Sequence, residues 1–178
     1  MEYRLSEIAE ITNSKLSGSS HDNSLITNLI YDSRKLVFPE NTLFVALVGD
    51  RNDGHKYLLE LYRKGVRFFL VQQKPNLKKM PKAGFIETGD TLKALQRLAR
   101  FHRQQFEIPI VGITGSNGKT IVKEWLFQLL NSSFKITRSP KSYNSQLGVP
   151  LSVLQLKKED TLGTVSYTHL TLPTNREV

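Results

Sequence analysis

The sequence of 178 residues contains no cysteine, one tryptophan and two methionines. The absence of cysteine excludes disulfide frameworks, zinc sites built on thiolates and cysteine nucleophiles. No apolar run approaches the roughly 20 residues that a membrane-spanning helix requires. The N-terminal segment carries acidic residues and lacks the apolar core of a secretory signal, and it is not typical of a transit peptide. These absences predict a cytoplasmic protein with no membrane span.

Basic residues (25) outnumber acidic residues (16), and the formal net charge is +9. The excess is spread over the whole chain, whereas a nucleic-acid-binding protein usually gathers its basic residues on one stripe with aromatic ones among them. The densest basic group, Lys74, Lys78, Lys79 and Lys82, lies around two prolines and is typical of a solvated loop. The charge therefore favours small phosphorylated ligands, and we expect no nucleic-acid partner.

Apolar runs and helical periods alternate along residues 1–107, which is typical of an α/β domain. Buried strands are predicted at residues 26–31, 42–47, 68–71 and 85–87, and helices at residues 55–64 and 91–106. We expect residues 1–107 to form one small α/β domain.

A second pattern of strand, loop and helix begins at residue 108. Residues 108–113 form a continuous apolar run suited to a strand covered on both faces. Residues 119–130 have a helical period, which is expected to turn Val122, Leu126, Leu129 and Leu130 toward a sheet, with Trp125 beside them. Residues 134–137 would form the next strand. The predicted fold class is thus α/β, a small N-terminal α/β domain followed by the start of a parallel-sheet domain with a phosphate loop.

The segment Gly-Ile-Thr-Gly-Ser-Asn-Gly-Lys-Thr, residues 112–120, lies between this strand and helix. Glycines let backbone N–H groups converge on a phosphate, and the helix N-terminus adds partial positive charge. Lys119 can reach the β and γ phosphates, and the Thr120 hydroxyl can bind Mg²⁺. The spacing departs from the strict G-x-x-x-x-G-K-[ST] pattern, because Ile113 stands five residues before Gly118. The alternative is a plain glycine-rich turn.

This loop resembles the ATP loop of the Mur ligases, which are ATP-dependent amino-acid and peptide ligases of peptidoglycan synthesis. Residues 31–35, 39–49 and 53–55 resemble the D-S-R…P-G-D-x-F-V-A-x-x-G…D-G-H pattern of the family's uridine-nucleotide domain, with Glu40-Asn41 in place of Gly-Asp. Residues 142–151 resemble its N-N-x-x-G-x-P-L segment, in which a serine replaces the second asparagine.

Within the family, the segments resemble most closely the branch that adds D-alanyl-D-alanine to UDP-N-acetylmuramoyl-tripeptide, including a form fused to an alanine racemase. The branch that adds the third amino acid is the alternative. Folylpolyglutamate synthase is less similar, since it lacks a comparable domain ahead of the loop. A nucleotide-binding module without ligase activity is a further alternative.

The resemblance implies that ATP phosphorylates the terminal carboxylate of a UDP-N-acetylmuramoyl-peptide and that the amine of D-alanyl-D-alanine attacks the acyl phosphate. It implies ATP and Mg²⁺ as cofactors, with Thr120 near the metal. Lys119 is the predicted catalytic residue, because phosphoryl transfer depends on positioning and on neutralising the phosphate charge. The predicted ATP-binding residues are Thr114, Gly115, Ser116, Asn117, Gly118, Lys119 and Thr120.

The predicted substrate-binding residues lie in three loops. They are Ser33 and Arg34, Asp53 and His55, and Asn144 and Ser145. A guanidinium in the first loop could contact a diphosphate, but an Asx-type turn with the arginine in solvent is the alternative. The aspartate of the second loop is at least as well explained as a helix N-cap. The third loop could equally cap a following strand.

The resemblance ends near Leu156. Residues 108–163 are expected to begin a central ATP-binding domain, and residues 164–178 to form a non-native tail, with a divergent natural terminus as the alternative. The family's later metal-binding residues and C-terminal domain do not follow. We therefore expect a ligase part that is inactive alone, with a short parallel sheet that leaves apolar surface exposed. The sequence does not predict the oligomeric state.

Overall fold

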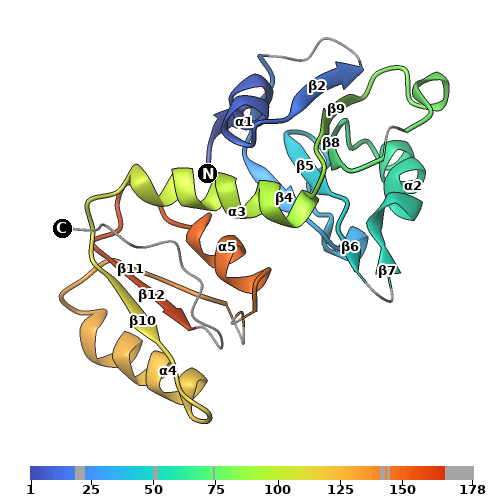
Figure 1. The fold of residues 1–178 in the computed structure, drawn as a ribbon. Coiled ribbons are helices and arrows are strands. Elements are labelled where there is room, and N and C mark those ends of the chain that lie inside the picture. The colour runs from blue at the N-terminus through green and yellow to red at the C-terminus, as the bar shows by residue number, and fades with distance from the viewer. Residues whose placement is uncertain (19–22, 50–51, 74, 141–142, 144, 167–178) are drawn as a thin grey trace. The chain divides into compact units, whose positions relative to one another are not determined.

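The structure is a computed structural model. It describes residues 1–18, 23–49, 52–73, 75–140, 143 and 145–166. The chain divides into two compact units, Met1–Leu98 (unit 1) and Ala99–Val178 (unit 2) (Figure 1). The border between them falls within helix α3 (Thr91–Gln104), several residues before the predicted domain border at residue 107.

Unit 1 is built on a five-stranded sheet in the order β2-β9-β8-β5-β4. Its strands are β2 (Lys15–Gly18), β4 (Asn28–Ile30), β5 (Thr42–Val45), β8 (Phe68–Val71) and β9 (Gly84–Glu87). Strands β4, β5, β8 and β9 run parallel, and β2 pairs antiparallel with β9 at the edge. The loops that follow the four parallel strands therefore leave from the same side of the sheet, which we call the carboxyl edge.

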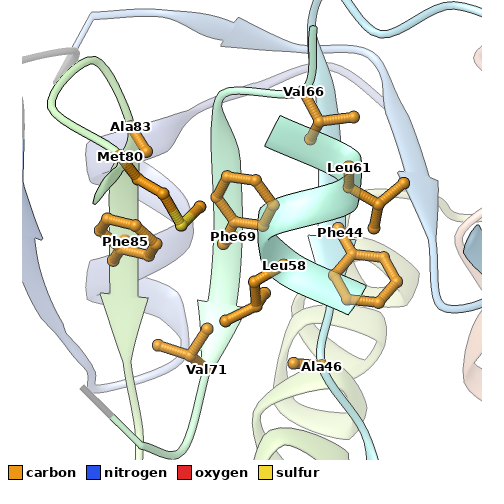
Figure 2. Packing of buried hydrophobic residues seen from close by; sticks show 10 residues of the cluster. All are labelled: Phe44, Ala46, Leu58, Leu61, Val66, Phe69, Val71, Met80, Ala83 and Phe85. Atoms are coloured by element: carbon orange, nitrogen blue, oxygen red, sulfur yellow. The ribbon is translucent and has the colours of Figure 1, made fainter. Parts of the chain in front are cut away.

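The central strands of this sheet are buried on both faces, which explains their uninterrupted apolar sequence. Helix α2 (Leu58–Arg63) contributes Leu58 and Leu61 to a core cluster with the phenylalanines of β5, β8 and β9 (Figure 2). The rings of Phe69 and Phe85 stack with 5.5 Å between centroids, and Phe44 meets Phe69 edge-on at 6.5 Å. Helix α1 (Leu5–Ile11) buries Leu5, Ile8 and Ala9 in the same unit.

Shorter elements complete unit 1 and refine two predictions. The predicted strand at residues 26–31 is two strands, β3 (Leu25–Ile26), which pairs with β1 (Tyr3–Arg4), and β4, which pairs with β5. The predicted helix at residues 55–64 starts as the 3₁₀ turn η2 (Gly54–Tyr57) and continues as α2. The other short elements are β6 (Val48–Gly49), β7 (Asn52–Asp53), η1 (Ser33–Lys35) and η3 (Leu77–Lys79).

Unit 2 contains a parallel sheet in the order β10-β12-β11. The strands are β10 (Ile110–Ile113), β11 (Ile136–Arg138) and β12 (Leu162–Ser166). Helix α4 (Lys119–Leu130) connects β10 to β11, and α5 (Gly148–Val153) precedes β12 (Figure 1). The tail border predicted at residue 164 falls inside the buried central strand, while residues 167–178 lie outside the described residues. Both units confirm the predicted α/β class.

The expected orientation of α4 is wrong for three of its apolar residues, whereas Leu126 and Leu130 are half-buried. Val122, Trp125 and Leu129 are 44%, 62% and 74% exposed, and the residue that α4 buries completely is Lys123. The described sheet has three strands, so α4 has too little sheet surface to cover its apolar stripe. The exposed apolar surface agrees with the expectation for a short parallel sheet. Among the described helices, none is long and apolar enough to cross a membrane.

Candidate functional site

The loop between β10 and α4 has the backbone geometry of an anion site. Gly115 and Gly118 have φ of +146° and +77°, conformations that favour glycine. A Cβ atom at Gly118 would meet nothing within 4 Å. Glycine is therefore required there by the backbone conformation and not by lack of space. Helix α4 begins at Lys119 without a side-chain cap from Gly118. A helix N-terminus of this kind attracts phosphate through its first N–H groups and its dipole.

Lys119 folds back over this loop. Its Nζ donates hydrogen bonds to the carbonyl oxygen of Gly115 and, at 3.5 Å, to that of Ser116. Phosphate oxygens are stronger acceptors for an ammonium group than neutral carbonyls are, so a bound phosphate could replace both contacts. The remaining predicted ATP-binding residues, Thr114, Asn117 and Thr120, are exposed in the same segment.

The residues of this loop fit a nucleoside triphosphate with Mg²⁺. The two glycine conformations and the lysine suit the phosphates of such a ligand, and the exposed Thr120 hydroxyl suits the metal. Within the described ranges, no group of three or more His, Asp and Glu residues could hold a metal ion. A metal bound through Thr120 would therefore share its coordination with phosphate oxygens.

A buried lysine lies one helical turn beyond the loop. Nζ of Lys123 donates a 2.6 Å hydrogen bond to the carbonyl oxygen of Ser139, directly after β11. Its side chain is fully buried, and its Nζ lies 3.8 Å from Oε1 of Glu124, which pairs with Arg138. Burial lowers the pKa of Lys123, and the Glu124 carboxylate opposes this shift. Sequence reasoning missed this residue. The one feature of the sequence that could have indicated it is its spacing of four residues from Lys119, which places both lysines on the same face of the helix.

The predicted site at residues 144–145 is only partly described, because Asn144 lies outside the described residues. Oγ of Ser145 accepts a 3.1 Å hydrogen bond from the backbone N–H of Gly148. Gly148 packs against Tyr143, where a Cβ atom would approach its Cα to 2.7 Å. Ser145 thus holds a turn that leads into helix α5, and not into the strand that the capping alternative assumed.

In unit 1, Asp32 and Arg34 form a local turn after β4. The Asp32 carboxylate accepts hydrogen bonds from the Arg34 backbone N–H at 3.1 Å and from Nε and Nη2 at 2.9 and 2.8 Å. These hydrogen bonds from Arg34 lower the pKa of Asp32 to about 2. The geometry matches the Asx-type turn, and the Arg34 side chain is 87% exposed. Ser33 is half-buried in the same turn.

Asp53 and His55 form a second cluster, in the loop that follows β5. Oδ1 of Asp53 accepts the backbone N–H of His55 at 2.9 Å and lies 2.6 Å from Nδ1 of its ring. The two hydrogen bonds from His55 lower the pKa of Asp53, the backbone bond contributing most. Asp53 is therefore the N-cap of η2, as the structural alternative predicted.

The predicted residues Ser33, Arg34, Asp53 and His55 all follow neighbouring parallel strands, so the fold gathers them at the carboxyl edge of unit 1. The backbone N–H groups of Gln72 and Gln73, which follow β8, donate to Nε2 of His55 at 3.0 and 3.2 Å. Nε2 of Gln72 also donates a 3.3 Å hydrogen bond to the carbonyl oxygen of Gly89 after β9. Sequence reasoning missed these last three residues, because nothing in their local pattern indicates the contact.

Ligands of open parallel α/β sheets bind outside the carboxyl ends of the strands. A polar carboxyl edge in unit 1 and a glycine-rich loop ahead of helix α4 in unit 2 define an α/β protein with two candidate ligand sites. Residues 113–166 match the family model of the Mur ligase middle domain. The UDP-N-acetylmuramoyl-tripeptide--D-alanyl-D-alanine ligase of Bacillus subtilis is 32% identical over 150 residues, which cover 84% of this chain and 32% of that protein. The chain is homologous to the Mur ligases over most of its own length.

Solved structures agree with this assignment. MurF of Thermotoga maritima in complex with ADP matches with a TM-score of 0.67 and 28% identity over 79% of this chain and 32% of that one. MurF of Acinetobacter baumannii has a TM-score of 0.86 over 95% of this chain and 36% of that one, and at 24% identity it shows the fold alone. The chain spans about a third of the length of the curated relatives it matches.

Proposed function

We propose that this chain forms the substrate domain, residues 1–107, and the beginning of the ATP-binding domain, residues 108–163, of a cytoplasmic ligase. The ligase would join D-alanyl-D-alanine to UDP-N-acetylmuramoyl-tripeptide. The observation that carries the proposal is the loop at residues 114–120, with its two glycine conformations and its folded lysine, in a chain whose relatives bear the name of this ligase.

ATP would supply the phosphoryl group that activates the substrate carboxylate. Backbone N–H groups of residues 114–118 would hold its phosphates, and Lys119 would neutralise their charge once its ammonium leaves the loop carbonyls. The Thr120 hydroxyl would hold Mg²⁺ together with phosphate oxygens. Lys119 is thus the catalytic residue of the proposal.

The uridine diphosphate of the second substrate would bind at the carboxyl edge of unit 1. The exposed guanidinium of Arg34 and the neighbouring Ser33 hydroxyl lie at this edge. The carboxylate of Asp32 holds Arg34 in place while leaving the side chain largely in solvent. Asp53 and His55 belong to the same edge. Asn144 and Ser145 stay separate substrate-binding candidates of unit 2.

Isothermal titration calorimetry on the chain itself tests both sites. Mg²⁺ with ATP and UDP-N-acetylmuramoyl-tripeptide should each bind with a stoichiometry of one. Lys119→Met should abolish the ATP signal and leave the second ligand unaffected. Lys158→Met removes an exposed lysine outside the loop and serves as the matched control. Equal ATP affinity of Lys119→Met and the control would refute the loop assignment.

Titration with UDP-N-acetylmuramic acid, which lacks the peptide, distinguishes recognition of the nucleotide sugar from recognition of the peptide. Binding of this ligand with unchanged affinity would mean that the chain recognises the nucleotide sugar and leaves peptide recognition to other parts of the ligase. No binding of any uridine nucleotide would refute the role proposed for unit 1.

A further inference from the structure

The His55 side chain connects three groups of the protein at the carboxyl edge of unit 1. Its side chain is 10% exposed, whereas that of Asp53 is 44% exposed. Asp53 lies against Nδ1 of the ring, and two backbone N–H groups, those of Gln72 and Gln73, point at Nε2. Both ring nitrogens are therefore used by the protein itself.

The partners of the ring determine its tautomer. A backbone N–H can only donate, so Nε2 must be an acceptor and carry no proton. The proton of the neutral ring is then on Nδ1, where it is donated to Oδ1 of Asp53 at 2.6 Å. A substrate atom finds neither nitrogen of His55 available in this arrangement. This result argues against the direct substrate contact that the sequence suggested.

The contacts of His55 join loops that are distant in sequence. The ring connects η2, which follows β5, to Gln72 and Gln73, which follow β8. The side-chain amide of Gln72 extends the connection to Gly89 after β9. The loops after three adjacent parallel strands are thus linked through one imidazole and one amide.

Two further contacts fix the base of this network. The N–H of Gly54 donates a 2.8 Å hydrogen bond to the carbonyl oxygen of Leu47, and Oγ1 of Thr91 donates a 3.1 Å hydrogen bond to that of Ala46. His55 therefore extends from a turn that is itself held against the end of β5. A ligand that binds outside the carboxyl ends of these strands meets loops that are already ordered, which lowers the entropy cost of binding.

We propose that His55 is a positioning residue of the nucleotide-sugar site, which orders the loop after β8 through its neutral ring and does not touch the substrate. This inference rests on the function proposed for unit 1. The group responsible is the acceptor at Nε2, and the contact with Asp53 serves to orient the ring.

Two substitutions distinguish the contribution of Nε2 from that of Nδ1. His55→Gln places a carbonyl oxygen near the position of Nε2, where it can accept the N–H groups of Gln72 and Gln73. His55→Asn places an amide N–H near Nδ1, where it can donate to Asp53, but supplies no acceptor for the loop. Gln73→Ala keeps the backbone donor and removes only the side chain, so it is the matched control.

Calorimetry with UDP-N-acetylmuramoyl-tripeptide is the binding test. His55→Asn should weaken binding about tenfold or more, because two backbone donors lose their acceptor. His55→Gln and Gln73→Ala should bind within about threefold of wild type, and the ATP affinity of all three should stay unchanged. Equal weakening by the Asn and Gln variants, or no weakening by either, would overturn the proposal.

Amide hydrogen exchange without any ligand tests the positioning step separately. The amides of Gln72 and Gln73 should exchange faster in His55→Asn and as in wild type in His55→Gln. Unchanged exchange in His55→Asn would overturn the proposal even if binding were weakened. If the wild-type chain binds no uridine nucleotide, the function proposed for unit 1 fails, and the exchange data still report whether His55 orders the loop.

Discussion

Gly54→Ala is the substitution whose consequence the structure defines most sharply. A Cβ atom at this position would lie 2.9 Å from both Cα of Ala46 and N of Leu47. These atoms are backbone and cannot rotate away. Their positions are further fixed by the hydrogen bonds from Ala46 N–H to the Leu70 carbonyl at 2.9 Å and from Gly54 N–H to the Leu47 carbonyl at 2.8 Å. The turn that carries His55 must therefore shift.

The size of the effect follows from this overlap. Forcing an extra methyl group into a packed site typically costs about 1–3 kcal/mol. In a domain of this size, each kcal/mol lowers the melting temperature by roughly 4–8 °C, so unit 1 should melt at least about 4 °C lower. Gly89→Ala, at the same carboxyl edge, would place its Cβ with nothing within 4 Å. That control should stay within about 0.5 kcal/mol of wild type.

Thermal unfolding of the whole chain, followed by far-UV circular dichroism, measures both variants. The fluorescence of Trp125, the one tryptophan in the sequence, reports on unit 2 and should not change its midpoint. A Gly54→Ala variant as stable as Gly89→Ala would refute the close packing of this turn against the end of β5.

Three further predictions concern Gly118, Lys123 and Asp32. Gly118→Ala should weaken ATP binding in calorimetry and also lower the unfolding midpoint of unit 2, because the positive φ costs about 1–2 kcal/mol even though the Cβ meets no atom. The pKa of Lys123 is lowered in the folded chain, so the unfolded chain binds more protons just below pH 10.5. The stability of unit 2, measured by Trp125 fluorescence, should therefore rise as pH approaches 10.5. Lys123→Met should abolish this rise. The contribution of Asp32 to stability is complete above its ordinary pKa of 3.8 and should be lost only as pH falls through about 2. Its carboxyl carbon should therefore titrate near pH 2 by NMR, and at higher pH when Arg34→Ala removes the side-chain hydrogen bonds and keeps the backbone one.

Local sequence patterns predicted the elements that depend on local forces. The limits of β8 and α4 agree with prediction, because one is a short apolar run between polar residues and the other begins at the Gly-Lys pair of the loop. The gathering of Ser33, Arg34, Asp53 and His55 at one edge also follows from the order of parallel strands. Their binding roles stay predictions.

Features that depend on contacts between distant segments could not be predicted in this way. The strand expected at residues 26–31 divides because its two parts pair with different strands, and only the fold supplies those partners. His55 reaches backbone donors 17 and 18 residues away, and Lys123 reaches a carbonyl 16 residues away. The orientation of α4 depends on how many strands lie beneath the helix. The periodicity of the helix sequence carries no information about that number.

We propose two separate nucleotide sites in this chain, one in each unit. Backbone amide NMR spectra recorded during titration with Mg²⁺ and ATP, and then with UDP-N-acetylmuramoyl-tripeptide, test this proposal most directly. ATP should shift the signals of residues 114–120, and the uridine nucleotide should shift those of Ser33, Arg34, Gln72 and Gln73. Unchanged signals of residues 114–120 at saturating ATP, or one common set of signals shifted by both ligands, would contradict it.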